Sequence, residues 1–216
     1  DAMTLCKRLL PTAALTASAL CAPNAWAQVE TSIRGSAWSG DRTAAADDGA
    51  IIDFELWARN RWDLGENLFL HAEGWLAQNP IGDGDPDIDI REGYLSWRLG
   101  DVRLNVGRQV FAWGRADRLN PTDVLGARDM RRLVEDDNDN RLGIGALTAQ
   151  GPLAGGEITA IWAPEFRATE LPQSFAGRGF ELREIDPGGA ANQFALRYER
   201  FGEAVDWSVT LADVFD

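Results

Sequence analysis

Apolar and polar residues alternate with a period of two through much of this chain. In one segment, Ile52, Phe54 and Leu56 alternate with Asp53 and Glu55. Successive side chains of a β-strand point to opposite faces, so this period predicts strands with one apolar and one polar face. The same pattern recurs, clearly or more weakly, at 29–38, 68–76, 92–99, 102–107, 141–149, 156–163, 193–199 and 205–211. We therefore expect an all-β protein of about nine strands, whose lengths suit the roughly 9–11 residues of a tilted membrane strand.

The connectors between these strands alternate between long and short. The long ones are 40–50, 78–87, 114–140 and 164–191, and the short ones are 63–66, 100–101, 151–155 and 202–204. Outer-membrane barrels have this rhythm, with tight periplasmic turns and long external loops, whereas the Greek-key connections of a soluble β-sandwich have no reason to keep it. We expect an antiparallel, transmembrane, up-and-down β-barrel with a periplasmic N-terminus, in which 114–140 is the third external loop.

The polar faces of the predicted strands carry charge, and the apolar faces carry almost none. Asp53, Glu73 and Arg197 lie on polar faces, where a water-filled lumen would hydrate them. On a lipid face, each charge would cost about 2–4 kcal/mol near the middle of the membrane. Arg108 is the exception, because it shares a face with apolar residues. It must lie near the rim or follow a bulge, for which Gly107 is the expected position.

Residues 1–27 have the composition of a secretory signal peptide that follows two leading residues. Lys7 and Arg8 supply its basic start, a short apolar run comes next, and an Ala-x-Ala cleavage site closes it. A lipoprotein signal acylated at Cys21 is the alternative, which the leucine before it disfavours. The rest, 28–216, is expected to be the N-terminal part of a longer outer-membrane barrel of a Gram-negative bacterium. Single-chain bacterial barrels have an even number of strands, and an open sheet edge is not viable in lipid.

The composition of 28–216 narrows the partners. No cysteine and no lysine remain in it, and 19 arginines stand against 33 acidic residues, for a net charge of −14. This segment therefore has no thiolate for a disulfide or a metal site. Its acidity argues against a nucleic-acid partner, and we expect no cofactor. The expected partners are the lipid bilayer of the outer membrane and small polar solutes, and a homo-oligomer is left open.

The segment from Gly107 to Gly143 begins and ends as a strand and contains the long loop, which is rich in both signs of charge. Loops of this length are usually functional or disordered, and we expect this one to fold over or into the mouth of the barrel. Rings of charged side chains select ions and oriented polar solutes. A second interpretation is that these charges pair with one another and hold the loop closed, and both remain open. The predicted constriction consists of Arg115, Asp117, Arg118, Asp123, Arg128, Arg131 and Arg132.

A sequence motif lies at the start of this segment: a GRQ-V-x-WG pattern followed by an N-P-x-D turn. With it, the chain resembles a group of large Gram-negative outer-membrane barrels near the porin-like and alginate-export-type barrels. The resemblance is most specific over about 40 residues, and it implies a barrel and a pore. No substrate and no catalytic residue carry over with it. The motif residues are Gly107, Arg108, Gln109, Trp113, Gly114, Asn120, Pro121 and Asp123.

Two further groups bear on metal binding and catalysis. Asp83, Asp85 and Asp87 alternate along an external loop and are weak calcium candidates, because Ile88 stands where an EF-hand needs its glycine. His71 is the only histidine, and the chain has no G-x-S-x-G motif around a nucleophile. We expect no metal and no enzyme activity.

Together these features predict a channel for passive or selective diffusion of small polar or charged solutes, such as saccharides or organic acids. One alternative is a barrel enzyme with a catalytic group near His71. The other is a soluble, secreted β-sandwich that binds glycans through its tryptophans.

Overall fold

A computed structural model describes residues 29–38, 51–78, 86–113, 123–132, 134, 136, 138–171, 191–202 and 205–215. All regular secondary structure in this part of the chain is β-structure. The strands are β1 (Glu30–Trp38), β2 (Ile51–Asp63), β3 (Leu68–Gln78), β4 (Pro86–Leu99), β5 (Val102–Gln109), β6 (Ala127–Arg128), β7 (Arg141–Leu142), β8 (Ile144–Leu153), β9 (Gly156–Ala163), β10 (Gln193–Arg200) and β11 (Trp207–Asp213).

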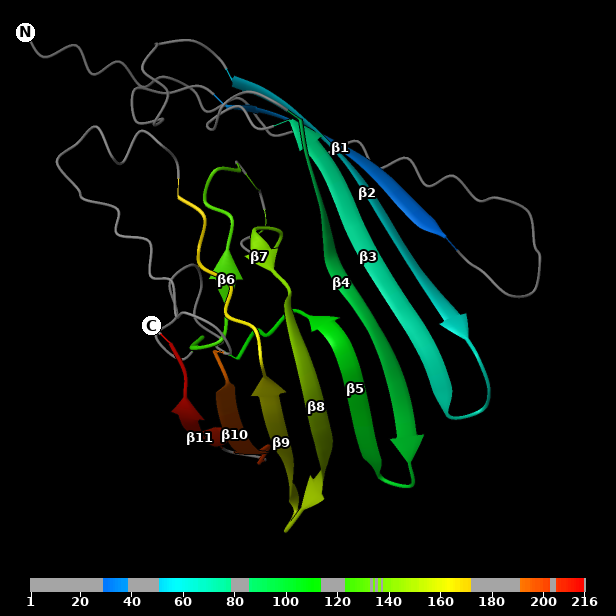
Figure 1. The fold of residues 1–216 in the computed structure, drawn as a ribbon, viewed down its shortest axis with the longest axis vertical. Coiled ribbons are helices and arrows are strands. Elements are labelled where there is room, and N and C mark those ends of the chain that lie inside the picture. The colour runs from blue at the N-terminus through cyan, green and yellow to red at the C-terminus, as the bar shows by residue number, and fades with distance from the viewer. Residues whose placement is uncertain are drawn as a thin grey trace, which may run out of the picture.

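Nine of these strands form one antiparallel sheet in the order β1-β2-β3-β4-β5-β8-β9-β10-β11, and β6 pairs with β7 in a separate ribbon. Each strand of the large sheet pairs with the next one along the chain, so the predicted all-β, antiparallel, up-and-down arrangement is confirmed. Among the described residues, β1 and β11 are the two edges, and the sheet is not closed on itself. The sheet is strongly curved, with β6 and β7 on its hollow side (Figure 1).

The described residues include no helix with the length and apolar character needed to cross a membrane.

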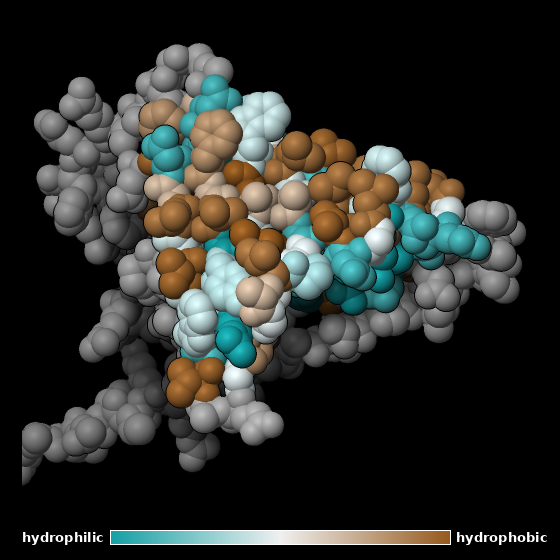
Figure 2. Space-filling model, turned by 90° about the horizontal axis from the view of Figure 1, so that it is seen from below, coloured by the Kyte–Doolittle hydropathy of each residue, from teal (hydrophilic) through white to brown (hydrophobic). Residues whose placement is uncertain are grey.

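The two faces of the sheet differ in the way that the period of two predicts. In β2, Phe54 is 59 % exposed, whereas its neighbours Asp53 and Glu55 are 2 % and 7 % exposed. We call the face that carries Asp53 and Glu55 the inner face, because the segment between β5 and β8 packs against it, and the opposite face the outer face. Apolar side chains such as Ile88 and Val106 are exposed on the outer face. Figure 2 shows hydrophobic side chains gathered in a broad patch on the surface of the sheet.

A β-bulge in β4 changes which residues of that strand point to the inner face. Glu73 of β3 pairs with Glu92, but the next residue, Gly74, pairs with Ile90, so Arg91 is left as the extra residue. A bulge of this kind opposes two residues to one and re-aims the side chains on either side. Arg91 and Glu92 therefore both reach the inner face, while Ile90 stays on the outer face.

The predicted bulge at Gly107 is not formed. The β4–β5 and β5–β8 ladders run through Gly107 and Arg108 without a register shift. Gly107 has a φ of 128°, and a Cβ there would lie 2.3 Å from the carbonyl oxygen of Gly93, so this position requires glycine. The charge of Arg108 is instead paired: its guanidinium donates to Asp89 at 3.2 Å and to the carbonyl of Ile90 at 3.1 Å.

The predicted strand at 141–149 is divided in two. Arg141–Leu142 forms β7 and pairs with β6, and only Ile144–Leu153 joins the large sheet as β8. The break falls at Gly143, where a Cβ would lie 1.9 Å from the carbonyl oxygen of Arg91. The chain thus crosses directly over the bulge in β4 before it enters the sheet, and sequence periodicity does not report that crossing.

Candidate functional site

The segment between β5 and β8, residues 110–143, is here called the excursion. Its described part spreads across the inner face and contacts strands at both ends of the sheet. The carbonyl oxygen of Trp113 accepts a hydrogen bond from Arg197 of β10 at 2.6 Å. Toward the other edge, Asp139 forms an ion pair with Arg34 of β1. The excursion therefore folds back onto the polar face of the sheet.

Arg132 ties the excursion to β2 and β3. It is 4 % exposed, and its guanidinium donates to Glu55 at 2.5 Å and to the carbonyl of Asp139 at 2.9 Å. The same guanidinium stacks on Trp75, with its carbon 3.7 Å from the ring centroid. Trp57 completes the group by donating its indole N–H to Glu55 at 2.8 Å. A planar guanidinium suits this site because it can bind a carboxylate with its edge and an indole with its face.

Arg131 lies among three carboxylates that come from three parts of the chain. It pairs with Asp87 of β4 at 2.8 Å, with Asp129 of the excursion at 2.9 Å, and with Glu170, which follows β9. The hydrogen bond with Asp129 raises the pKa of the Arg131 guanidinium above its ordinary value. Backbone bonds add to the junction, because the N–H of Met130 donates to the carbonyl of Glu170 at 2.8 Å.

Asp123 is the centre of a third group, at the base of the excursion. It accepts from Arg141 at 2.5 Å, pairs with Arg128 at 3.5 Å, and accepts the backbone N–H of Trp113 at 2.8 Å. Arg128 also donates to the side chain of Asn140 at 3.1 Å. These bonds join the two ends of the excursion around the β6–β7 ribbon.

The Asp139 carboxyl of the excursion is partly buried and has a shifted pKa. Burial raises the pKa of the Asp139 carboxyl above its ordinary value, although the neighbouring guanidinium of Arg34 lowers it. The penalty for burying this carboxylate is thus only partly offset by its ion pair.

The structure brings the described members of the predicted constriction, Asp123, Arg128, Arg131 and Arg132, into ion pairs. Arg131 and Arg132 reach different strands of the sheet, so the set is spread over the inner face and does not form one cluster. The pairs of Asp123 with Arg128 and of Arg131 with Asp129 lie within the loop, whereas Arg131 and Arg132 also pair with acidic residues of β4 and β2. Arg115, Asp117 and Arg118 lie outside the described residues, as do Gly114, Asn120 and Pro121 of the motif and Asp83 and Asp85 of the calcium candidates.

The described motif residues have local structural roles around the start of the excursion. Gln109 is 5 % exposed and joins β5 to β8: it donates to the carbonyl of Ala146 at 3.0 Å and accepts from the hydroxyl of Thr148 at 3.0 Å. Gly107 permits the close approach of β4 described above, and Trp113 bonds to Asp123. These contacts direct the chain out of the sheet and across its inner face.

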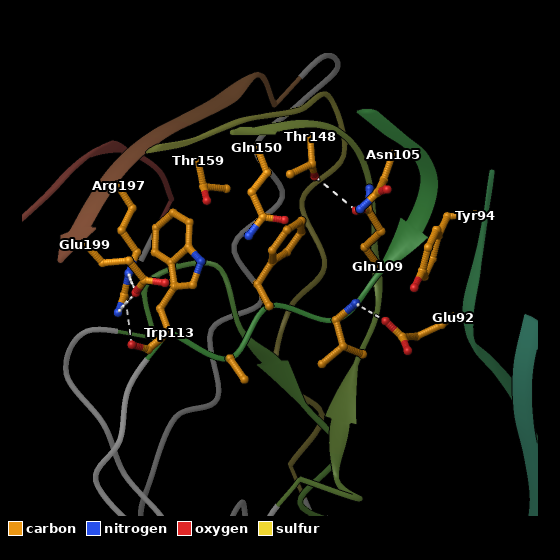
Figure 3. A pocket seen from close by; sticks show the side chains of 13 residues that line it. Glu92, Tyr94, Asn105, Gln109, Trp113, Thr148, Gln150, Thr159, Arg197 and Glu199 are labelled. Carbon is orange, nitrogen blue, oxygen red and sulfur yellow. Dashed lines mark hydrogen bonds and ion pairs between the residues drawn. The ribbon is translucent and has the colours of Figure 1, made fainter. Parts of the chain in front are cut away.

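A cavity of about 270 Å³ lies between residues 110–113 and the inner face of β4, β5, β8, β9 and β10. Figure 3 shows the side chains of Gln150 and Thr159 pointing from the strands toward Trp113, and that of Thr148 directed at Gln109. Glu92 and Tyr94 line one end of the cavity, and an ion pair between Arg197 and Glu199 lines the other. About half of its lining residues are polar and uncharged.

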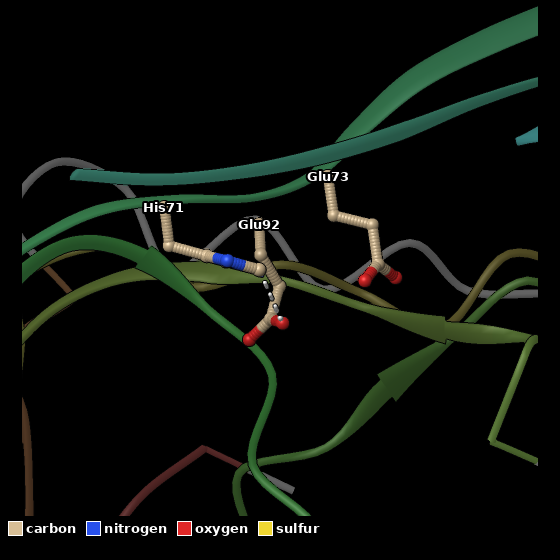
Figure 4. A group of neighbouring side chains, drawn as sticks. All are labelled: His71, Glu73 and Glu92. Atoms are coloured by element: carbon tan, nitrogen blue, oxygen red, sulfur yellow. Dashed lines mark ion pairs between the residues drawn. The ribbon is translucent and has the colours of Figure 1, made fainter. Parts of the chain in front are cut away.

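A cluster of His71, Glu73 and Glu92 lies on the inner face near that cavity (Figure 4). The atoms that could bind a metal lie within 4.8 Å of one another, and His71 is 3.5 Å from Glu92. Both carboxylates already have partners. Glu73 pairs with Arg91 at 2.5 Å, and Glu92 accepts the N–H of Val110 at 3.1 Å. A metal ion would have to displace these donors, so the cluster fits a hydrogen-bonded wall better than a metal centre.

Several residues of the site could not be identified from the sequence. Arg34, Glu55, Arg141 and the wall of the cavity were not predicted as site residues. The alternation does place Glu55 on the polar face, and that signal would have selected it as a candidate partner for a loop arginine. Comparison with protein-family models, with curated proteins and with solved structures finds no match to this chain.

Proposed function

We propose that this chain forms part of the wall of an outer-membrane channel in a Gram-negative bacterium, through which small polar or charged solutes diffuse. One observation carries the proposal: the sheet exposes large apolar side chains on its outer face and buries charged ones such as Asp53 and Glu55 on its inner face. Ile88 is 76 % exposed on the outer face, whereas Asp53 is 2 % exposed on the inner face. A soluble antiparallel sheet with one covered face normally does the reverse.

The surroundings of the outer face support a lipid contact. A β-sandwich would cover an apolar face with a second sheet. In the described part of the chain, the only other β-pairing with named strands is the short β6–β7 ribbon, and it lies on the inner face. The exposed side chains of the outer face continue from β1 to β11, as Ile33, Leu70, Leu147 and Leu211 illustrate. Lipid chains would cover this apolar surface. In a closed barrel, the backbone groups at the edges β1 and β11 would also be hydrogen-bonded.

The position of the excursion favours a narrow, selective channel over a wide pore. It occupies the inner face, and its ion pairs with β1, β2 and β4 hold it there. In the proposed channel it narrows the lumen. Asp123, Arg128, Arg131 and Arg132 form the described part of this constriction, and Arg115, Asp117 and Arg118 complete it. The charges that face the lumen would then orient polar solutes.

The proposal is tested by labelling the two faces of the sheet. Residues 28–216 contain no cysteine, so single cysteines at Leu56, Leu70 or Glu73 can carry a fluorophore on the full protein in lipid vesicles. We expect lipid-borne quenchers to reach positions 56 and 70, and water-soluble quenchers to reach position 73. Planar-bilayer recordings of the same protein should show ion conductance.

Cell fractionation could contradict the proposed membrane location. Recovery of the protein from the soluble periplasm without detergent would exclude the membrane wall. So would quenching of position 73 from the lipid phase.

A further inference from the structure

The cavity beneath residues 110–113 has the chemistry of a binding site for a neutral sugar. We propose that it holds one unit of an uncharged saccharide on the path through the channel, an inference that rests on the proposed function. The cavity measures about 270 Å³, slightly less than the roughly 300–1,000 Å³ typical of small-molecule pockets. That size suits a single sugar ring better than an extended chain.

The wall of the cavity offers hydrogen-bonding groups that have no partner among the described residues. The side-chain oxygen of Asn105 is shielded from solvent and has no hydrogen-bond partner among the described residues. The hydroxyls of Tyr94 and Thr159 line the cavity, and within the described part of the chain no hydrogen bond to either is formed. Each of these hydroxyls can both donate and accept, as can the amide of Asn105, which matches the hydroxyls of a sugar.

Other groups of the wall are fixed in place by neighbours. Gln150 donates its amide N–H to Glu157 at 2.5 Å, which leaves its carbonyl oxygen as an acceptor. Arg197 donates to Glu199 at 3.0 Å and to the carbonyl of Trp113 at 2.6 Å. Groups held in this way lose little conformational entropy when a ligand binds.

Aromatic rings form the roof of the cavity. Phe111 and Trp113 meet edge to face, with centroids 6.5 Å apart and planes at 68°. The guanidinium of Arg197 lies 5.7 Å from the ring of Trp113 and helps to hold it. An aromatic face offers apolar contact to the C–H face of a sugar ring, while the wall opposite offers hydrogen bonds.

The charge of the lining favours a neutral sugar over an acidic one. Glu92 and Glu199 both line the cavity, and Arg197 is the one guanidinium among its described lining residues. That guanidinium is already paired with Glu199. An anionic solute would therefore meet an excess of negative charge and would find no free cation among the described lining groups.

Saturation-transfer NMR on the full protein in detergent micelles tests this site directly. D-glucose and D-glucuronate are suitable probes, because they share a ring and differ by one carboxylate. We expect saturation transfer to glucose and at least about tenfold weaker binding of glucuronate, from the electrostatic mismatch. Trp113→Leu should weaken glucose binding about tenfold through loss of the ring contact.

Two further variants make the result specific. Thr159→Val removes one hydroxyl with little change of shape, and it should weaken glucose binding several-fold without disturbing the excursion. Trp97→Leu changes an exposed tryptophan of the outer face and should leave glucose binding unchanged.

The outcomes separate this inference from the proposed function. Ion conductance without glucose binding, or equal binding of glucose and glucuronate, would overturn the sugar site and leave the channel standing. Glucose binding that depends on Trp113 and Thr159, in a protein that shows no conductance, would support the site and overturn the channel. Equal effects of Trp97→Leu and Trp113→Leu would also overturn the site.

Discussion

Single arginines connect parts of this protein that are distant in sequence. Arg131 is the clearest case, because its guanidinium holds three carboxylates from β4, from the excursion and from the segment after β9. It occupies the position that a cation would take in a site made of carboxylate oxygens. Asp87 was a calcium candidate in the sequence, and the structure gives it this guanidinium as a partner.

Replacing Arg131 should convert the junction into a calcium site. In Arg131→Gln, the carboxylates of Asp87, Asp129 and Glu170 would lose the guanidinium they share, with oxygens already within 4.8 Å of one another, and Arg167 would remain 3.4 Å from Glu170. We expect Ca²⁺ to stabilise the variant by about 1.4 kcal/mol at a concentration ten times its Kd. Thermal unfolding with and without Ca²⁺ measures the effect.

The matched control is Arg61→Gln, which breaks an exposed ion pair with Asp63. Calcium should leave the stability of this control and of the unaltered protein unchanged. If the Arg131 variant shows no more response to calcium than the control, the three carboxylates do not act together.

At the scale of elements, close backbone contacts at two glycines mark where the excursion leaves and re-enters the sheet. It leaves just after Gly107, which is paired within β5 and whose backbone closely approaches Gly93 of β4, and it returns at Gly143, which crosses over Arg91. The bulge at Arg91 belongs to this crossing, since Arg91 donates to the carbonyls of Asn138 at 2.6 Å and of Arg141 at 3.2 Å. The bulge and the glycine together seat the β6–β7 ribbon on the inner face.

Gly143→Ala should therefore loosen the excursion. A Cβ at this position would lie 1.9 Å from the carbonyl oxygen of Arg91, and the backbone would have to move. Overpacking of this kind costs about 1–3 kcal/mol. Hydrogen exchange of residues 123–142 measures the local free energy of opening, which we expect to fall by that amount.

Gly65→Ala is the control, because a Cβ there would meet nothing within 4 Å. It should leave exchange in 123–142 unchanged. Equal protection in both variants would mean that the crossing at Gly143 is not tight.

At the scale of the whole molecule, the sheet presents an apolar outer surface and a polar interior. This distribution also makes a quantitative prediction about adjacent residues of β3. Leu70 is 38 % exposed on the outer face, and His71 lies on the inner face, 3.5 Å from Glu92. Leu70→Arg should reduce stability in lipid vesicles, because the charge would enter the hydrocarbon. Leu70 is the third residue of β3, so the loss should be smaller than the roughly 2–4 kcal/mol of a site at the middle of the membrane. The yield of protein folded into vesicles, followed through a urea titration, measures this loss.

His71→Arg places the same charge one residue away and should cost much less, because Glu92 remains as its partner. If the outer face were in water, Leu70→Arg would reduce stability no more than His71→Arg. The same variant also tests the alternative that the protein is a barrel enzyme, because loss of His71 would then abolish activity.

The strands and their two faces follow from the sequence alone, because the direction of a side chain along a strand depends only on local backbone geometry. Thus the alternation at 51–63 correctly separates Phe54 from Glu55, and the turn at Gly100 and Asp101 falls where it was expected. The partners of the charged residues were decided only by the tertiary structure. Glu55 and Arg132 are 77 positions apart, and Arg34 and Asp139 are 105 apart. These pairs depend on the path of the excursion across the sheet, which is determined by the close backbone contacts at Gly107 and Gly143 and by the bulge at Arg91. Such contacts between distant segments leave no periodic signal in the sequence. The cavity on the inner face is formed by these contacts and therefore exists only in the tertiary structure.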